Sequence, residues 1–272
     1  MRKSLAEQIP EFRKKILKFY KENRREFLWR DTHIPYEILV SEMMLQQTQT
    51  GRVVEKYAVF LSSFPTVSHL AKAPASDVLK IWQGLGYNRR ALYLKRTAEI
   101  LCEKHGGTFP KLKSDLVNLP GVGINTAGAV IAFAYNQPVI FIETNIRRVF
   151  IHEFFREKEK VSDQEIYPLI EATIDTKNPR DYYYSLMDYG AYLGKTIVNP
   201  NRRSETYSKQ SIFEGSRRQV RGIILKLLVE KPLTDKILAK QFENSKFYDE
   251  ALKQLEKEGF IVRKSNKLSL KS

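Results

Sequence analysis

The stretch Leu119-Pro120-Gly121-Val122-Gly123 lies between two segments with helical spacing of apolar residues, and it constrains the fold more than any other feature. Residues 112–118 and 125–135 predict the two flanking helices. A proline and two glycines within five residues predict a tight turn, because glycine adopts positive φ without steric cost. The N–H groups of the turn and of the helix start behind it can then face a phosphate. Taken alone, the same pattern also fits an ordinary helix–helix turn.

Most of the remaining chain also predicts helices, and the expected fold class is all-α. Apolar residues recur every three or four positions through residues 7–25, 36–47, 51–60 and 89–105. No strand pairing is expected before residue 258.

The chain is strongly basic, with 46 Lys and Arg against 31 Asp and Glu and a formal net charge of +15. Such a charge predicts a polyanionic partner, of which nucleic acid is the commonest, because neutralised phosphates supply affinity. Charge that serves only solubility is the alternative reading. The N-terminus lacks an apolar signal region and no stretch resembles a membrane span, so we expect a cytoplasmic, nucleoid-associated protein that does not contact membranes.

Metal and cluster chemistry is not expected. Cys102 is the single cysteine, so the chain cannot supply a cysteine-rich zinc site or an iron–sulfur cluster from its own thiols. Its helical surroundings predict a small core residue. The four histidines are scattered without ligand spacing, and we expect no cofactor.

The last 58 residues differ from the rest of the chain, with 14 Lys and Arg against 7 Asp and Glu. Helices are expected at 217–229, 235–241 and 246–258, followed by a hairpin over 260–270. Three short helices and a hairpin are typical of a winged helix-turn-helix, here assigned to 215–272. The basic charge favours duplex contact, with protein docking or a cap that only packs on the main body as alternatives.

Four motifs occur in the order and spacing of the helix-hairpin-helix DNA glycosylases. They are Ser41-Glu42-Met43-Met44-Leu45-Gln46-Gln47-Thr48-Gln49, Gly84-Leu85-Gly86-Tyr87, Leu119-Pro120-Gly121-Val122-Gly123 and Glu143-Thr144-Asn145-Ile146-Arg147-Arg148-Val149. Leu28-Trp29-Arg30 and Met187-Asp188-Tyr189-Gly190-Ala191 also fit. The resemblance covers about residues 20–195, and the first motif resembles MutY-like adenine glycosylases more than endonuclease III.

The resemblance implies a two-lobed helical fold with the target base entering between the lobes. A six-helix barrel over residues 36–140, which includes the helix-hairpin-helix, would be inserted into a terminal lobe made of 1–35 and 141–212. The expected partner is double-stranded DNA with a mispaired or damaged base, bound by a monomer.

The resemblance assigns catalysis to two carboxylates. Glu42 matches the acid that protonates adenine, which a carboxylic acid can do only if burial raises its pKa towards neutrality. Glu143 stands where the family usually has aspartate, the carboxylate thought to stabilise the oxocarbenium-like sugar and assist water. Its extra methylene extends the reach of the charge and leaves the geometry open. Asn145 could orient that carboxylate or bind a phosphate.

Asn125 matches the Schiff-base lysine of bifunctional relatives, and asparagine cannot form that adduct. The resemblance therefore implies a monofunctional enzyme, with weak adventitious lyase activity from Lys111 or Lys113 left open. Gln46 and Gln47 match the wedge that fills the stack when a base is extruded. The full set of expected DNA-binding residues is Gln46, Gln47, Thr48, Tyr87, Arg89, Gly121, Gly123, Asn125, Thr126, Asn145 and Arg147.

The chain departs from the family at three further places. Asn88 stands where a second aromatic often follows Tyr87, which weakens the case for 8-oxoguanine recognition. Gly194 stands where relatives with a cluster place their first cysteine, so the segment after it must be ordered by packing and hydrogen bonds. A winged helix is expected in place of the long C-terminal domain that inspects 8-oxoguanine.

Three functions fit these features. The first is excision of adenine opposite guanine or 8-oxoguanine, supported by Glu42 and the Gln-Gln-Thr run. The second is excision of thymine or uracil opposite guanine. The third is a non-catalytic DNA-binding protein derived from a glycosylase, against which the two retained carboxylates argue; transcriptional regulation by the winged helix alone leaves the first 200 residues unexplained.

Overall fold

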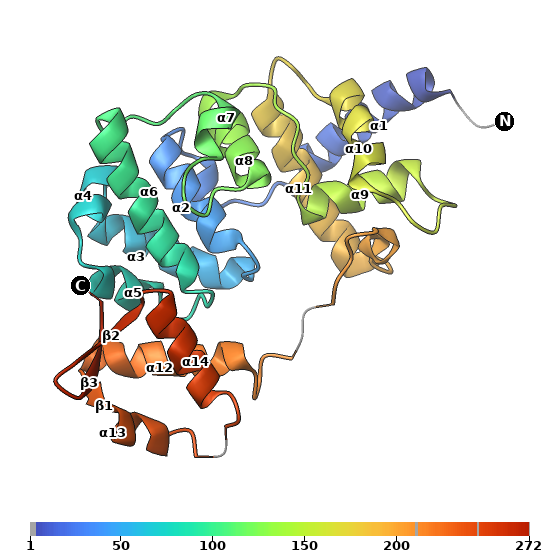
Figure 1. The fold of residues 1–272 in the computed structure, drawn as a ribbon. Coiled ribbons are helices and arrows are strands. Elements are labelled where there is room, and N and C mark those ends of the chain that lie inside the picture. Colours follow the sequence, from blue (N-terminus) through green and yellow to red (C-terminus); the bar gives the residue numbers. More distant parts are fainter. Residues whose placement is uncertain (1–3, 210–211, 244, 272) are drawn as a thin grey trace. The chain divides into compact units, whose positions relative to one another are not determined.

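The structure is a computed structural model that describes residues 4–209, 212–243 and 245–271. The chain is mostly helical, with one small antiparallel sheet near its C-terminus (Figure 1). It divides into two compact units. The first contains Met1–Glu42, Pro110–Asn118 and Val122–Lys209, and the second contains Met43–Phe109, Leu119–Gly121 and Gln210–Ser272. Helix α2 (Pro35–Leu45) belongs to the first unit up to Glu42 and to the second from Met43.

The first unit is built around three long helices, α1 (Leu5–Asn23), α9 (Thr144–Phe154) and α11 (Pro179–Thr196), of which α11 packs against both others. Helix α1 shows the expected spacing, because Phe12, Ile16 and Tyr20 are its buried face. The unit also contains α7 (Lys113–Leu116), α8 (Ile124–Tyr135), α10 (Asp163–Thr173) and two 3-10 turns, Leu28–Arg30 and Pro200–Arg203.

The second unit packs α4 (Val67–Lys72) and α5 (Ala75–Trp82) against α6 (Arg89–His105), and α3 (Thr50–Ser63) against α5. Phe60 and Trp82 are fully buried at its centre, with their ring centroids 5.9 Å apart. Such edge-to-face aromatic pairs bury large apolar side chains and stabilise the core in which they lie.

The C-terminal segment belongs to the second unit and contains the three expected helices, α12 (Arg217–Glu230), α13 (Asp235–Lys240) and α14 (Tyr248–Lys257). The expected hairpin is formed by β2 (Ile261–Lys264) and β3 (Lys267–Leu270). A two-residue strand that the sequence did not predict, β1 (Leu233–Thr234), pairs with the other edge of β3 and gives the order β1-β3-β2. The chain is therefore mostly helical, not all-α.

Three local expectations need adjustment. Gly121 has φ +74°, as the turn requires, but Gly123 has φ −82° and serves as the residue before α8. Cys102 on α6 is partly exposed and so lies at the margin of the core. The first hairpin helix, expected over residues 112–118, is shorter than expected, because α7 covers only Lys113–Leu116. Within the residues that the structure describes, no helix combines the length and apolar character needed to cross a bilayer.

Candidate active site

Glu42 is an acid on an apolar helix. Its neighbours along α2 include Ile38, Leu39 and Val40, all buried, while Glu42 itself keeps a small exposed surface. The carboxyl group has neither a hydrogen-bond partner nor an ion-pair partner among the described residues. Burial, and then the negative charge of Glu143, raise the pKa of Glu42 to about 8. Glu42 is therefore mostly protonated at neutral pH and can donate a proton.

Glu143 is the N-cap of α9. Its Oε1 accepts the backbone N–H groups of Asn145 at 2.8 Å and Ile146 at 3.0 Å. The pKa of Glu143 is raised overall, because burial outweighs the two N–H groups and the charges of Arg148 and Arg147, which act to lower it. The extra methylene of glutamate therefore does not leave the carboxylate loose, because the helix terminus fixes one of its oxygens.

Asn145 contacts the Glu143 carboxylate directly. Its Nδ2 donates to the other oxygen of Glu143 at 3.3 Å, and its Oδ1 accepts from Arg148 Nη1 at 2.7 Å. Arg148, which sequence reasoning missed, also donates to the Gly190 carbonyl at 2.7 Å and to Asn199 Oδ1 at 3.0 Å. A chain of hydrogen bonds thus runs from Glu143 through Asn145 and Arg148 to helix α11.

The motifs around Arg30 and Asp188 form a buried ion pair. Arg30 donates two parallel hydrogen bonds to Asp188, both 2.7 Å, and Arg25 Nε donates a third at 2.5 Å. Burial alone would raise the pKa of Asp188, but Arg30 and Arg25 hold it below its usual value. The Arg30 guanidinium also lies 4.5 Å from the centroid of the Tyr184 ring.

Tyr184 interacts with both Arg30 and Glu42. Burial, followed by the charge of Glu42, raises the pKa of the Tyr184 phenol. Its ring stacks on Phe133 at 4.4 Å. The ion pair therefore joins the Leu28-Trp29-Arg30 and Met187-Asp188 motifs, in which Arg30 and Asp188 are 158 positions apart in sequence.

Side chains at the starts of α7 and α8 hold the segment that leads to Glu143. Asn125 Oδ1 accepts the backbone N–H of Ile142 at 3.2 Å, and Thr126 beside it is buried. Lys113 donates to the Ile140 carbonyl at 2.7 Å, and burial lowers the pKa of its ammonium. Lys111 lies 5.9 Å from the Tyr135 ring centroid. Asn125 and Lys113 thus position residues 140–142, immediately before Glu143.

The segment after Gly194 does not fit an iron–sulfur cluster. A side chain at Gly194 would place its Cβ 2.7 Å from Arg148 Nη1, so a guanidinium fills the space that a cysteine would need. Asn201 Nδ2 donates to the Thr144 carbonyl at 2.9 Å, and Arg203 donates to the Arg156 carbonyl at 3.0 Å. Hydrogen bonds therefore order residues 199–203. In the described part of the chain no group of three His, Cys, Asp or Glu side chains could hold a metal ion.

Of the other expected DNA-binding residues in this unit, Arg147 is engaged within the fold. It makes two hydrogen bonds to Asp163, of 2.6 and 2.7 Å. Gly123 is exposed and has open space where a Cβ would lie. The geometry thus gives Arg147 a role in joining α9 to α10 and leaves Gly123 accessible.

The second unit contains the expected wedge residues and the Gly84–Tyr87 loop. Gln46 is half-buried, Gln47 is exposed with φ +53°, and Thr48 Oγ1 donates to the Leu85 carbonyl at 3.2 Å. Arg90, which sequence reasoning missed, fastens this region. It donates to seven acceptors, namely the carbonyls of Met43, Met44, Gln46, Leu85, Gly86 and Tyr87 and the hydroxyl of Thr48.

Gly121 makes a close approach inside the same unit. A Cβ there would lie 2.8 Å from Met43 Cε and 2.8 Å from Tyr93 Cβ. Together with φ +74°, this contact restricts the position to glycine. Tyr87 also has a positive φ, +46°, and Arg89 is paired with Glu258.

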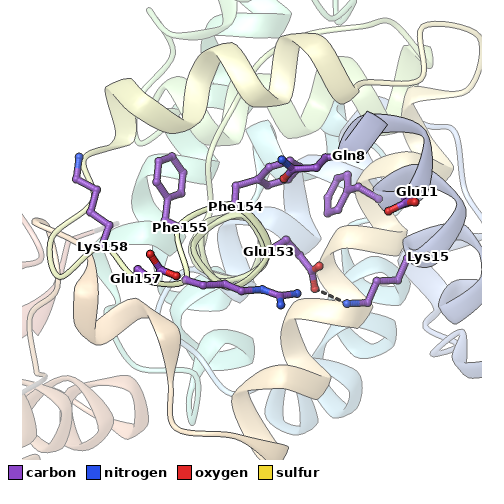
Figure 2. Close-up of a pocket in the computed structure, with 10 residues that line it drawn as sticks. Gln8, Glu11, Lys15, Glu153, Phe154, Phe155, Glu157 and Lys158 are labelled. Atoms are coloured by element: carbon purple, nitrogen blue, oxygen red, sulfur yellow. Dashed lines mark hydrogen bonds and ion pairs between the residues drawn. The ribbon is translucent and has the colours of Figure 1, made fainter. Parts of the chain in front are cut away.

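A separate hollow of about 900 Å³ lies between the ends of α1 and α9 (Figure 2). Phe12 and Phe154 line it together with charged side chains, and Lys15 bridges to Glu153 at 2.6 Å. Neither Glu42 nor Glu143 lines this hollow, so it contributes nothing to the chemistry described above.

Comparison with known proteins identifies relatives among base excision DNA repair proteins. The family description "HhH-GPD superfamily base excision DNA repair protein" matches residues 40–172. The chain is 34% identical over 184 residues to an adenine DNA glycosylase of Buchnera aphidicola, covering 67% of this chain and 52% of that protein. It is 31% identical over 181 residues to a thymine/uracil-DNA glycosylase of Methanothermobacter thermautotrophicus, covering 65% and 82%.

A solved structure shares the fold. A thermostable thymine-DNA glycosylase superposes with a TM-score of 0.64 at 27% identity, covering 72% of this chain and 91% of that one. The chain belongs to the HhH-GPD superfamily of base excision DNA repair proteins. It spans about half the length of the adenine DNA glycosylases that it matches.

Proposed function

We propose that the protein is a monofunctional DNA glycosylase that hydrolyses the N-glycosidic bond of adenine mispaired with guanine or 8-oxoguanine. The observation that carries the proposal is the unequal pair of buried carboxyl groups, with the pKa of Glu42 at about 8 and Glu143 held by a helix N-terminus. Similarity to adenine DNA glycosylases supports it further.

In this mechanism Glu42 protonates the extruded adenine, which then leaves as a neutral base. The C1′–N9 bond breaks and positive charge develops on the sugar. The Glu143 carboxylate faces that charge and assists the water that completes hydrolysis. Asn125 offers no amine, so no Schiff base forms there and the product is an abasic site.

The duplex is the proposed partner of a monomer, engaged from both compact units. In the second unit the binding residues are Gln46, Gln47, Thr48, Tyr87, Arg89 and Gly121. In the first they are Gly123, Asn125, Thr126, Asn145 and Arg147. We also propose that the chain consists of a terminal lobe (1–35 and 141–212), an inserted barrel lobe (36–140) and a C-terminal domain (215–272).

The C-terminal domain is proposed to be a winged helix-turn-helix that contacts phosphates. Its element order and the β1-β3-β2 sheet support this assignment. Lys264 and Lys267 are exposed and directly opposite each other at the end of the hairpin. Like charges directly across a sheet are destabilising unless an anion lies between them. Replacing each lysine by alanine should reduce the salt slope of duplex binding by about 1.

Thymine or uracil opposite guanine is the second candidate substrate. The thymine/uracil-DNA glycosylase relative favours it, because the match covers 82% of that protein. A non-catalytic DNA-binding role is the third candidate, and the raised pKa of Glu42 argues against it.

One experiment separates the three. Single-turnover base release is measured on duplexes with A:8-oxoG, A:G, A:C, T:G and U:G, with alkali added to reveal abasic sites. Breakage only after alkali, on A:8-oxoG or A:G, is the expected result. Release confined to T:G or U:G selects the second candidate, and binding without release on every duplex selects the third.

Two variants of helix α2 make the test specific. Glu42→Gln should abolish release and leave duplex affinity unchanged, because it removes only the proton donor. Glu37→Gln makes the same chemical change in the first turn of the same helix and should retain activity. Full activity of Glu42→Gln would refute the mechanism.

A further inference from the structure

The N-terminal turn of α12 lies against the loop that carries Tyr87. Arg218 Nη1 donates a hydrogen bond to the Tyr87 hydroxyl at 2.7 Å, and its guanidinium carbon is 5.8 Å from the ring centroid. A second guanidinium, that of Arg90, lies 5.4 Å from the same centroid. One arginine from the C-terminal segment and one from α6 therefore hold a single aromatic ring.

Tyr87 combines an exposed side chain with an uncommon backbone conformation. It is 37% exposed, and its φ of +46° is one that tyrosine rarely adopts. A left-handed conformation at a bulky residue is strained and persists only where surrounding contacts enforce it. The ring is thus held in a defined position at the surface, where it contributes little to the hydrophobic core.

A second contact fastens the C-terminal segment beside the same loop. Glu258, at the end of α14, accepts hydrogen bonds from both Arg89 and Arg221, the latter at 2.6 Å. Burial alone would raise the pKa of Glu258, but Arg221 and Arg89 lower it overall, so the carboxylate stays charged. Helix α12 also contacts α5, and both helices belong to the same unit (Figure 1).

We propose that Arg218 is a positioning residue for DNA recognition, which fixes the Tyr87 ring so that it stacks against bases beside the extruded nucleotide. The C-terminal segment and the Gly84–Tyr87 loop then act as one DNA-engaging element. This inference rests on the proposed function to the extent that a base leaves the stack. A rigid aromatic platform gains stacking energy without first losing side-chain freedom, so fixing the ring strengthens binding.

The test is a double-mutant cycle in the full chain. Arg218→Ala removes the donor and Tyr87→Phe removes the hydroxyl acceptor while keeping the ring. The probe is a duplex with a tetrahydrofuran abasic analogue, so binding is measured without any excision. We expect each single variant to weaken the Kd by about 5- to 10-fold and the double variant to be no weaker than the worse single.

Two controls distinguish positioning from charge and from stability. Arg217→Ala removes the neighbouring charge, which is paired with Glu250, and should weaken the Kd less than Arg218→Ala. 2-Aminopurine placed opposite the abasic analogue should fluoresce less in the Arg218→Ala complex, because the base remains stacked in the duplex. The thermal midpoint of Arg218→Ala should match the wild type.

Additive effects of the two substitutions, or equal losses in Arg217→Ala and Arg218→Ala, would refute the proposal and leave only a charge effect. The outcome is independent of base specificity. A protein that shows coupling on the abasic duplex but excises nothing retains this inference and loses the proposed function. A protein that excises the base but shows no coupling retains the proposed function and loses this inference.

Discussion

The negative charge of Glu143 raises the pKa of Glu42, although the two residues lie on different helices and 101 positions apart in sequence. Burial acts in the same direction and is the larger cause. Because two neighbouring carboxyl groups in a low-dielectric site rarely ionise together, the proton stays on the group without partners. That group is Glu42, since Glu143 accepts two backbone N–H groups.

The first prediction concerns the pH dependence of base release. The rate should be level while Glu143 is ionised and Glu42 is protonated, and it should fall about tenfold per pH unit above the pKa of Glu42, about 8, because only the protonated acid is active. Single-turnover release measured from pH 6 to pH 10 tests this. A rate that stays level or rises through pH 9 would contradict it.

The second prediction uses the coupling between the two acids. Glu143→Gln keeps an oxygen that can cap α9 and removes the charge, so the pKa of Glu42 should fall and the alkaline limb should move to lower pH. The maximal rate should also drop by about 10²-fold or more, since the developing sugar cation loses its counter-charge.

Glu143→Asp is the matched control for that charge. It retains the carboxylate but shortens its reach to the N–H groups of Asn145 and Ile146. We expect its alkaline limb to stay near that of the wild type while its rate falls. An unchanged limb in Glu143→Gln would show that the charge of Glu143 does not reach Glu42.

The third prediction concerns stability. The folded state raises the pKa of Glu42 from 4.5 to about 8. The contribution of protonated Glu42 to the free energy of unfolding is therefore fully present below pH 4.5. As pH rises towards 8 the unfolded chain releases this proton and the folded chain retains it, which progressively destabilises the fold. Relative to wild type, Glu42→Gln should therefore gain on the order of 2 kcal/mol between pH 5 and pH 8, discounted for the partial exposure of the carboxyl.

Urea unfolding at the two pH values measures this gain. Glu37→Gln, on the same helix, controls for the loss of one titrating carboxyl group. A Glu42→Gln variant whose advantage shrinks with rising pH would show that burial does not disfavour the ionised acid.

Local sequence signals predicted most of the helices and the tight turn at Gly121. The pattern of apolar spacing located α1 and α6, and the proline–glycine cluster located the turn at Gly121. These features depend on neighbours within a few residues. Strand β1 escaped prediction because two residues show no periodicity and it pairs with β3, 33 or more positions away.

The arginines that organise the site could not be predicted in the same way. Arg90, Arg148 and Arg218 each lie in a basic run where nothing local distinguishes them from exposed neighbours. Their partners come from distant segments, such as the carbonyl of Gly190 for Arg148 and the hydroxyl of Tyr87 for Arg218. The acids that pair with Arg89 and Arg147, both proposed to contact DNA, were likewise not indicated by the local sequence.

The last prediction concerns the glycines that let α11 approach α9. Gly190 and Gly194 are four residues apart and so share one face of α11. A Cβ at Gly190 would lie 2.4 Å from the backbone oxygen of Asn145, which cannot move without shifting the start of α9. At Gly194 it would meet the end of the Arg148 side chain at 2.7 Å, which can move at the loss of its hydrogen bonds.

Thermal and urea unfolding should therefore rank the alanine variants. Gly190→Ala should lose about 3 kcal/mol or more and Gly194→Ala about 1–2 kcal/mol. Gly222→Ala, on α12 with nothing within 4 Å of the added carbon, should gain about 0.5–1 kcal/mol from helix propensity. Since Glu143 caps the same helix start that Gly190 contacts, Gly190→Ala should also slow base release at temperatures where it is folded. Equal stability of Gly190→Ala and Gly222→Ala would show that the close approach of the two helices is not required.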